Sequence, residues 1–170
     1  VAENLADLAS LYQRQNRHGE ARLLYERALS IQEKVEGAGR WEMVDLLAMM
    51  AKLYRDMDQY DTAEWAYRRA LDMGEKIKGR DSVELMGIMR NLAHFYGTHG
   101  RYDQAAELNE RLMGIMEKAL GPDHPDVATN LDVLATLHQS QGRLAEAESE
   151  FRRVLKIREK ALGRDHPQTG

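Results

Sequence analysis

The side chains of this chain that could do chemistry include its many carboxylates, its six histidines and its serines, but no cysteine. The lack of cysteine excludes disulfides, thiolate metal ligands and a cysteine nucleophile. His94, His99 and His138 fall on neighbouring predicted helices, but the two on one helix are not at the i, i+4 spacing that turns two ligands toward one metal ion. No serine stands in a G-x-S-x-G elbow, and no glycine-rich phosphate loop occurs. We therefore predict no catalytic residue, no metal site and no cofactor.

The many acidic residues are interpreted as parts of solvated helix faces. Glu146, Glu148 and Glu150, for example, have Arg152 and Arg153 close by, in the range at which ion pairs form along a helix. A catalytic carboxylate needs a cleft that shifts its pKa away from the usual value, and nothing in the pattern indicates one. The chain is accordingly predicted not to be an enzyme.

Length and composition limit the kinds of partner. The 170 residues are 43% hydrophobic, which is enough for a core, and 24 Lys and Arg against 28 Asp and Glu give a net charge of −4. This acidic balance without a basic block argues against nucleic acid. No apolar run approaches the roughly 18 residues of a membrane span. We therefore expect neither nucleic acid nor membrane as a partner, and we expect a cytoplasmic location because no signal peptide is visible.

The dominant feature of the sequence is a repeat of 42 residues. Segment 121–125 (Gly-Pro-Asp-His-Pro) recurs as segment 163–167 (Gly-Arg-Asp-His-Pro). Two columns at this period hold only alanine: Ala9, Ala51, Ala93 and Ala135 in one, and Ala21, Ala63, Ala105 and Ala147 in the other. Because alanine fits where two helices cross closely, the columns are predicted to mark the helix crossing within each repeat. The repeats, about 2–43, 44–85, 86–127 and 128–169, form a single array over residues 1–170.

Each repeat is predicted to be a pair of helices, so the fold class is all-α, with eight helices in four pairs and no strand. A first helix shows one apolar stripe at i, i+3, i+4 and i+7 in the third repeat, formed by Met89, Leu92, Ala93 and Tyr96. The stripe of the second helix in the fourth repeat is predicted to be Ala147, Phe151, Val154 and Leu155, running on to Arg158 and Leu162.

The ends of these helices are predicted from turn residues. The first helices should end at residues that tolerate a left-handed backbone: Asn16, Asp58, Gly100 and Gly142. The second helices should begin at Gly19, Asp61, Asp103 and Ala145, with a capping box from Asp61 to Glu64 and a looser start at Ala145. They should end at Gly37, Gly79, Gly121 and Gly163. In Asp-His-Pro, the Asp should cap the next helix and the Pro should open it.

At these positions the chain resembles the tetratricopeptide repeat, with its Leu-Ala-x-x-Tyr, helix-ending Gly and Ala-x-x-x-Tyr/Phe-x-x-Ala. The first repeat shows it as Leu8-Ala9…Tyr12 followed by Ala21…Tyr25…Ala28. The repeat length of 42 residues and the Glu-Lys-x-Leu-Gly-x-Asp-His-Pro ending are similar to the kinesin-light-chain type. The resemblance covers the whole chain. It implies a right-handed α–α superhelix, a solenoid of four tetratricopeptide helix pairs, whose concave face commonly receives a segment of a partner protein.

With that geometry, the groove candidates are the faces of the first helices that the apolar stripes leave free: Asp7, Ser10, Arg14, Asp45, Met49, Lys52, Arg55, Arg90, Asn91, His94, Thr98, Thr129, Asp132, Thr136 and Gln139. Among them a donor-rich cluster stands out: Lys52, Arg55, Arg90, Asn91 and His94. These donors suit the carboxylate and backbone of a bound acidic peptide. Met49, Asp132 and Thr136 are added as peptide-binding candidates, Met49 because its thioether adapts to varied partners. The alternative is a solvated face with incidental charges.

Two specificity devices of the family do not carry over. The carboxylate clamp of chaperone-binding members is matched only at Asn91, because Ala48, Thr129 and Val133 occupy other clamp positions. The Asn that commonly precedes Leu-Ala in kinesin light chains is likewise present only as Asn91. Neither specificity is therefore expected.

We thus expect a non-catalytic protein–protein interaction module that binds a partner peptide or segment. Two alternatives stay open: a structural scaffold that forms homo-oligomers through its exposed repeat ends, and a regulatory or sensor domain fused to an effector domain. The chain begins inside a first helix and stops at the start of a fifth repeat. We therefore expect a fragment of a longer protein.

Overall fold

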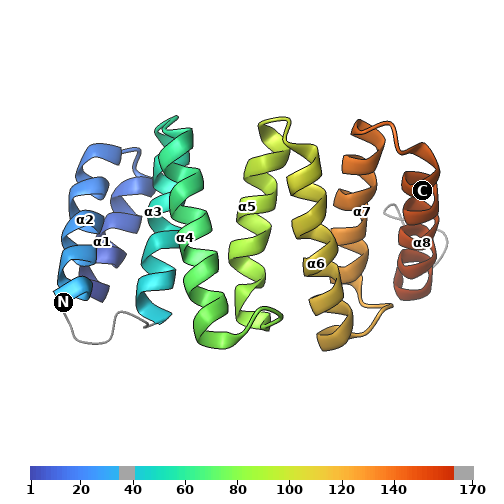
Figure 1. Ribbon diagram of the computed structural model, residues 1–170, viewed down its shortest axis with the longest axis horizontal. Helices are drawn as coiled ribbons and strands as arrows, with labels where there is room; N and C mark the ends of the chain where they lie inside the picture. Colours follow the sequence, from blue (N-terminus) through green and yellow to red (C-terminus); the bar gives the residue numbers. More distant parts are fainter. Residues whose placement is uncertain (35–40, 163–170) are drawn as a thin grey trace. The chain divides into compact units, whose positions relative to one another are not determined.

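The structure is a computed structural model that describes residues 1–34 and 41–162 (Figure 1). In these ranges it contains eight α-helices, one 3₁₀ turn (η1, Val83–Leu85) and no strand. The helices are α1 (Ala2–Arg14), α2 (His18–Lys34), α3 (Trp41–Asp56), α4 (Tyr60–Lys78), α5 (Met86–Thr98), α6 (Tyr102–Leu120), α7 (Pro125–Ser140) and α8 (Leu144–Leu162). For this part of the chain, the predicted all-α class and the four helix pairs are confirmed.

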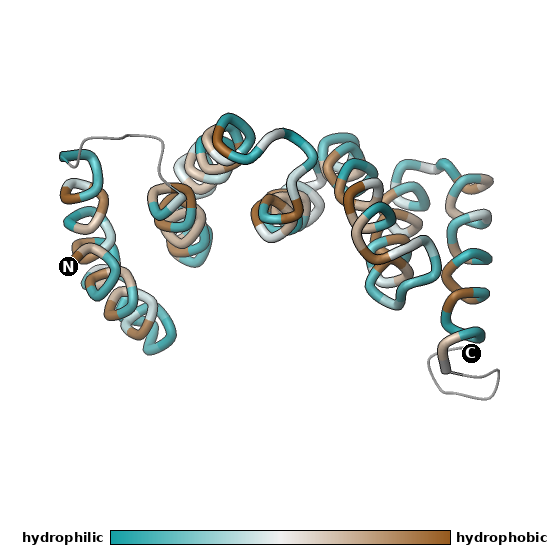
Figure 2. The backbone as a smooth tube through the Cα atoms, turned by 90° about the horizontal axis from the view of Figure 1, so that it is seen from below, coloured by the Kyte–Doolittle hydropathy of each residue, from teal (hydrophilic) through white to brown (hydrophobic). Residues whose placement is uncertain are grey.

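The chain packs as two compact units, Val1–Arg80 with α1–α4 and Asp81–Gly170 with η1 and α5–α8. In the first unit, α2 packs against both α1 and α3, and α3 packs against α4. In the second unit, α6 packs against both α5 and α7, and α7 packs against α8. A second helix thus contacts the first helix of its own repeat and of the following one, which is how stacked repeats build a continuous core. Figure 2 shows hydrophobic and hydrophilic residues alternating around the helices, as expected when one side is buried.

The two alanine columns lie at tight helix crossings, as predicted. None of their eight members is more than 4% exposed. In the third repeat, a methyl group added at Gly97 of α5 would lie 3.9 Å from the Cβ of Ala105 on α6. The near-complete burial of this position in all four repeats favours a small side chain, which explains why alanine recurs.

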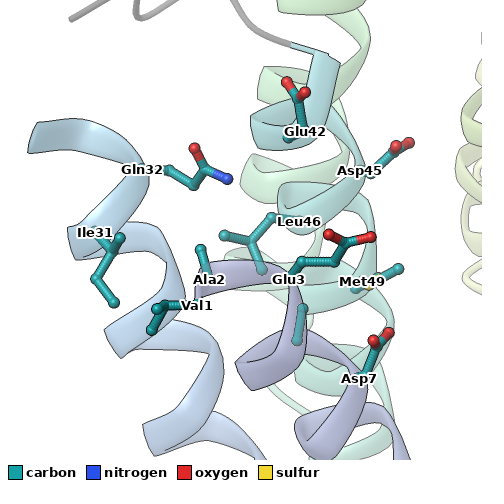
Figure 3. Close-up of a pocket in the computed structure, with 11 residues that line it drawn as sticks. Val1, Ala2, Glu3, Asp7, Ile31, Gln32, Glu42, Asp45, Leu46 and Met49 are labelled. Atoms are coloured by element: carbon teal, nitrogen blue, oxygen red, sulfur yellow. The ribbon is translucent and has the colours of Figure 1, made fainter. Parts of the chain in front are cut away.

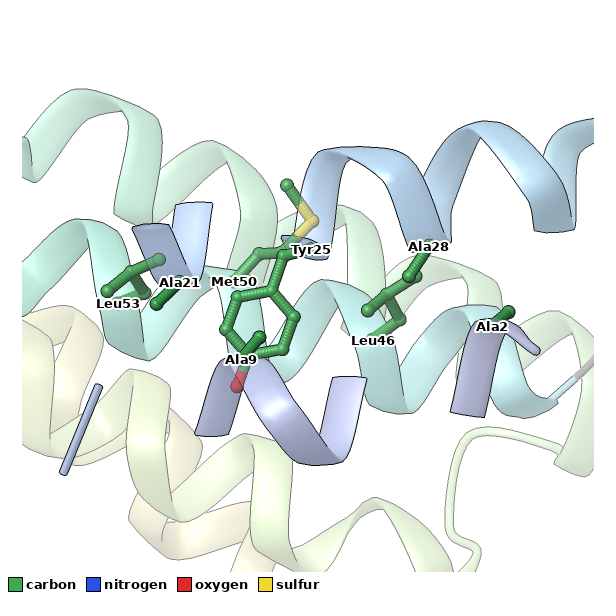
Figure 4. Packing of buried hydrophobic residues seen from close by; sticks show 8 residues of the cluster. All are labelled: Ala2, Ala9, Ala21, Tyr25, Ala28, Leu46, Met50 and Leu53. Atoms are coloured by element: carbon green, nitrogen blue, oxygen red, sulfur yellow. The ribbon is translucent and has the colours of Figure 1, made fainter. Parts of the chain in front are cut away.

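Tyr25 of α2 is one of the two largest fully buried side chains in the first unit. It is 1% exposed and belongs to a cluster with Ala9 of α1 and with Leu46 and Met50 of α3 (Figure 4). Burial raises the pKa of its phenol, and a hydrogen bond with Ser10 partly offsets that rise. The ring therefore ties three helices from two successive repeats into one core.

The predicted ends of the first helices are confirmed. Asn16, Asp58, Gly100 and Gly142 have φ of 60°, 59°, 71° and 76°. In each case the amide of the next residue reaches back to a carbonyl five residues earlier, as Arg143 N does to His138 O at 2.9 Å. This is the Schellman pattern, in which a left-handed residue lets the chain satisfy the last carbonyls of a helix.

The predicted starts of the second helices are wrong by one residue. The helices begin at His18, Tyr60, Tyr102 and Leu144. Asp61 therefore lies within the first turn of α4 and forms no capping box, and the N-cap is Gln59, which makes no side-chain cap bond. Asp103 and Ala145 likewise lie inside the first turns of α6 and α8.

The physical reason is that the Schellman turn leads directly into the next helix, without room for a separate cap. In three repeats an arginine stands just before the helix and binds the side chain three residues on. Arg17 pairs with Glu20, Arg101 Nε donates to Gln104 Oε1 at 2.5 Å, and Arg143 pairs with Glu146. These arginine pairs brace the first turns of α2, α6 and α8 from the side-chain level.

The ends of the second helices are confirmed where the structure describes them. Gly79 and Gly121 follow α4 and α6 with φ of 89° and 90°, whereas Gly37 and Gly163 lie outside the described residues. Pro125 is the first residue of α7, as predicted, but the cap is His124, whose Nδ1 accepts a hydrogen bond from the Asp126 amide at 3.1 Å. Asp123 instead accepts a hydrogen bond from Lys160 of α8.

The predicted apolar stripe of α8 is only half buried. Ala147 and Val154 are 4% and 3% exposed, but Phe151 and Leu155 are 36% and 42% exposed. The side chain of Leu162 lies outside the described residues. Ala147 and Val154 lie on the buried side of α8, which packs against α7. Phe151 and Leu155 lie on the other side, at positions that on α2 pack against α3.

A hydrogen-bonded carboxylate links the first and second repeats. Gln13 Nε2 of α1 donates to Asp56 Oδ2 of α3 at 2.6 Å, and Arg55 Nη2 lies 2.9 Å from Asp56 Oδ1. Burial acts to raise the pKa of Asp56, but these donors outweigh it and hold the pKa below its usual value. A carboxylate with a lowered folded-state pKa stabilises the fold above its unfolded pKa, about 3.9, and this contribution is lost as pH falls through the folded value.

We therefore expect Asp56→Asn to lower the free energy of unfolding at pH 7 by up to about 1 kcal/mol, since the pair is partly exposed. The difference from wild type should shrink to nothing below the folded pKa, where the wild-type carboxyl is also neutral. Urea unfolding followed by circular dichroism, at pH 7 and at a pH below the folded-state pKa of Asp56, measures this difference in stability. Glu107→Gln, on the exposed side of α6, is the control. A difference that is the same at both pH values would contradict the assignment.

Candidate functional site

The predicted site residues fall on three first helices. Met49, Lys52 and Arg55 lie on α3 of the first unit. Arg90, Asn91 and His94 lie on α5, and Asp132 and Thr136 lie on α7, all of the second unit. The donor cluster is therefore divided between the two units.

A pocket of about 460 Å³ in the second unit contains the α5 part of the cluster. Arg90, Asn91 and His94 line it because they share the polar side of α5, opposite the buried Met89, Leu92 and Ala93. The remaining lining comes from α6 and α7: Asn109, Met116, Asp126, Thr129, Asn130 and Val133. Cationic, amide and hydroxyl donors thus meet in one depression.

Two buried asparagines form part of the wall of this donor pocket. Asn109 and Asn130 are 4% and 7% exposed. Asn109 Nδ2 donates to Ala105 O at 2.8 Å, and Asn130 Nδ2 donates to the backbone carbonyl of Asn109 at 3.0 Å. These bonds satisfy buried amides that would otherwise be costly and hold α6 and α7 at a fixed distance on one side of the pocket.

A pocket of about 560 Å³ in the first unit contains Met49 and has a different chemistry (Figure 3). Four carboxylates line this acidic pocket: Glu3, Asp7, Glu42 and Asp45. Burial, and next the neighbouring charge of Glu42, raise the pKa of Asp45. The apolar part of the lining comes from Val1, Ala2, Ala6, Ile31, Leu46 and Met49, and Gln32 completes it.

The two pockets occupy equivalent places in the repeat array. Their linings are related by 84 residues, which is two repeats, so that Asp7 corresponds to Asn91, Asp45 to Thr129 and Met49 to Val133. Each lies between a first helix, the second helix of its repeat and the next first helix. The fold thus offers the same depression twice, and the side chains at a few positions decide what each one can bind.

Three of the other four predicted site residues, Arg55, Asp132 and Thr136, have partners within their own unit. Arg55 pairs with Asp56, and Asp132 accepts a hydrogen bond from Arg158 of α8 at 3.0 Å. The Thr136 hydroxyl donates to the backbone carbonyl of Asp132. Lys52 is exposed on α3. None of these four belongs to the lining of the acidic or the donor pocket.

The histidines considered as metal ligands lie in separate environments. His94 lines the donor pocket, and His99 stacks on Phe95 with 4.4 Å between ring centroids. His138 is 2% exposed, with Nδ1 2.9 Å from Glu150 Oε2 and Nε2 3.6 Å from Glu110 Oε1. Among the described residues, no group of three His, Asp or Glu could hold a metal ion. Nor does this part of the chain include a helix long and apolar enough to cross a membrane.

Sequence reasoning placed Arg90, Asn91, His94 and Thr129 on one face, but it missed the asparagine wall. A signal was present in the repeat columns. Asn109 stands where the other repeats have Tyr25, Tyr67 and Phe151, whereas the column of Asn130 holds Asn4, Leu46 and Ile88. An amide in an otherwise aromatic column is the signal for a polar site, and only the pairing of α6 with α7 brings Asn130 against Asn109.

Sequence patterns of the Tetratricopeptide repeat family match residues 1–40, 42–118 and 84–160. No curated protein matches the chain in sequence at a significant level. These repeats generally mediate protein–protein interaction and are typically non-catalytic.

Several solved structures share the fold. BtubC (BKLC) from P. vanneervenii is 25% identical with a TM-score of 0.84, and the similarity covers 98% of this chain but 66% of that one. A Podosopora anserina structure, described by its kinesin light chain nearly identical TPR-like repeats, is 24% identical, also at 0.84, over 98% and 79% of the two chains. Aspartyl phosphate phosphatase F from Bacillus subtilis is 17% identical at 0.75, over 94% and 40%. With family patterns across nearly its whole length and repeats like those of kinesin light chains, the chain belongs to the tetratricopeptide repeat family.

Proposed function

We propose that this chain is a non-catalytic binding module that docks an extended segment of a partner protein against its first helices, and that the donor pocket holds an acidic side chain or a terminal carboxylate of that segment. The observation that carries the proposal is the meeting of Arg90, Asn91 and His94 with Thr129 in one pocket. A guanidinium beside amide and hydroxyl groups can bind a carboxylate and a peptide backbone together. Asp126 also lines the pocket.

The affinity should be modest, on the order of micromolar, because an extended segment loses conformational entropy when it docks. Salt should weaken the complex, since Arg90 is exposed and the contact is screened.

We expect Arg90→Ala to weaken binding of the selected peptides by about 1–3 kcal/mol, the value of a charge-assisted hydrogen bond. The fold should be nearly unaffected, because exposed substitutions usually cost less than about 0.5 kcal/mol. A peptide-library screen, followed by calorimetric titration of wild type and variant, measures the effect. Arg68→Ala on α4 is the matched control, since Arg68 is 66% exposed and outside the donor pocket.

Selection of basic peptides, or equal binding by Arg90→Ala, would contradict the proposal. If the screen selects basic peptides, and these bind the Asp45→Asn variant more weakly than wild type, the segment docks in the acidic pocket instead.

A further inference from the structure

The two buried carboxamides in the wall of the donor pocket are only partly used by the protein itself. Asn109 Nδ2 donates to Ala105 O at 2.8 Å, and Asn130 Nδ2 donates to Asn109 O at 3.0 Å. A carboxamide has two N–H donors and a carbonyl acceptor. Among the described residues, no hydrogen bond reaches either side-chain oxygen, so each amide keeps its C=O and one N–H for another partner. Both residues line the pocket, and these groups can therefore bind a ligand in it.

The repeat fold does not require an amide at either position. Asn109 and Asn130 stand at the positions of Tyr25 and Leu46, two repeats earlier. There the ring and the leucine are 1% and 4% exposed and pack into one apolar cluster (Figure 4). A buried polar group with unused hydrogen-bonding capacity costs stability unless something satisfies it. Two such groups, at positions where the fold accepts apolar side chains, point to a ligand that completes their hydrogen bonds.

The donor pocket has two levels that differ in exposure. Arg90, Asn91 and His94 are exposed and form its rim, whereas Asn109 and Asn130 are only 4% and 7% exposed. A main-chain peptide group of a docked segment is flanked by a Cα on each side, so it stays at the rim. Only a side chain can extend from the segment to the two buried amides.

We propose that the amides of Asn109 and Asn130 bind the side-chain carboxamide of a glutamine or asparagine in the partner segment, close to the carboxylate that the rim donors hold. This inference rests on the proposed function and names a second group of the same segment. Glutamine should be preferred to asparagine, because its longer stem reaches deeper and can pack on Met116 and Val133, the apolar residues of the lining.

The chemistry of the other polar side chains does not match these amides. A carboxamide offers both a donor and an acceptor, as the unused groups of the two asparagines require. A carboxylate offers acceptors only, and it would face the two amide oxygens as well as Asp126, which also lines the pocket. An ammonium group offers donors only, and it would enter a pocket that already contains Arg90.

A peptide library with one fixed glutamate and random neighbours tests the proposal on the wild-type chain. The bound peptides should be enriched in glutamine, and less strongly in asparagine, at one position near the glutamate. A selected peptide is then compared by calorimetric titration with versions that carry methionine or glutamate at that position. Both versions should bind about tenfold more weakly, because the amides lose the group that satisfies them.

Asn109→Leu tests the same contact from the side of the protein. It removes the side-chain amide but keeps the backbone carbonyl to which Asn130 donates. The variant should bind the selected peptide about tenfold more weakly than wild type does, yet bind the methionine version equally well. Gln139→Leu, an exposed amide of α7 outside the donor pocket, is the matched control and should change neither affinity. Circular dichroism checks that both variants fold.

The outcomes separate this inference from the proposed function. Acidic peptides that show no enriched amide, but still bind Arg90→Ala more weakly, would overturn the inference and leave the proposed function standing. An Asn109→Leu variant that loses affinity equally for the selected peptide and its methionine version would also overturn it, because the residue would then act only through packing. The comparison of peptides on wild type tests the contact even if Asn109→Leu does not fold.

Discussion

Tyr25→Ala is expected to remove about 3–5 kcal/mol from the free energy of unfolding, the usual cost of truncating a buried aromatic side chain. The ring is 1% exposed and contacts helices of two repeats, so its loss leaves a cavity that no single helix can close. Domains of this size have about 5–15 kcal/mol of stability, so the variant should lose a large share of it. Urea unfolding followed by circular dichroism measures the change.

The repeat supplies a matched control for this prediction. Phe151→Ala removes an aromatic ring from the equivalent position on α8, where it is 36% exposed. It should cost much less than Tyr25→Ala, because the ring buries less apolar surface there. Equal losses at the two positions would show that cover by the next first helix is not what makes Tyr25 important.

Ala105→Leu is expected to lower the free energy of unfolding by about 1–3 kcal/mol, because three extra carbon atoms must be inserted at a fully buried position between two helices. Ala105 is fully buried on α6, and a methyl group on Gly97 of α5 would already lie 3.9 Å from its Cβ. Ala145→Leu, at an exposed position in the first turn of α8, is the control and should be nearly neutral. Thermal or urea unfolding compares them, and a neutral Ala105→Leu would mean that the crossing can open.

Most of the fold could be predicted because the sequence repeats four times. A single Asp58 is weak evidence for a helix end, but Asp58 in a column with Asn16, Gly100 and Gly142 indicates one left-handed position, and the φ values confirm it. The helix starts were predicted less well. Asp61 is a good capping residue in isolation, and only the geometry of the preceding turn excludes it from the cap position.

The candidate site was less predictable because it depends on where neighbouring helices meet. Arg90, Asn91 and His94 could be placed on one face by helical periodicity alone, and they do line one pocket. Asp132 was assigned to the same kind of face but pairs with Arg158, since a long arginine on α8 reaches it. Helical periodicity predicts which face of its helix a side chain lies on. Which partner that side chain contacts depends on the length and charge of the side chains on the next helix.

The equivalence of the two pockets shows that the residues that could bind a ligand are different from the residues that hold the fold together. At the three positions that hold Asp7, Asp45 and Met49 in the first unit, the second unit has Asn91, Thr129 and Val133, and all six are exposed side chains on well-packed helices. Substitutions there change charge and hydrogen-bonding capacity while the alanine crossings, left-handed turns and buried rings stay as they are. Each repeat junction can therefore acquire a new ligand preference by a few surface mutations with little loss of stability. A chain built this way can diversify its partners one junction at a time, without rebuilding the core that holds the junctions in place.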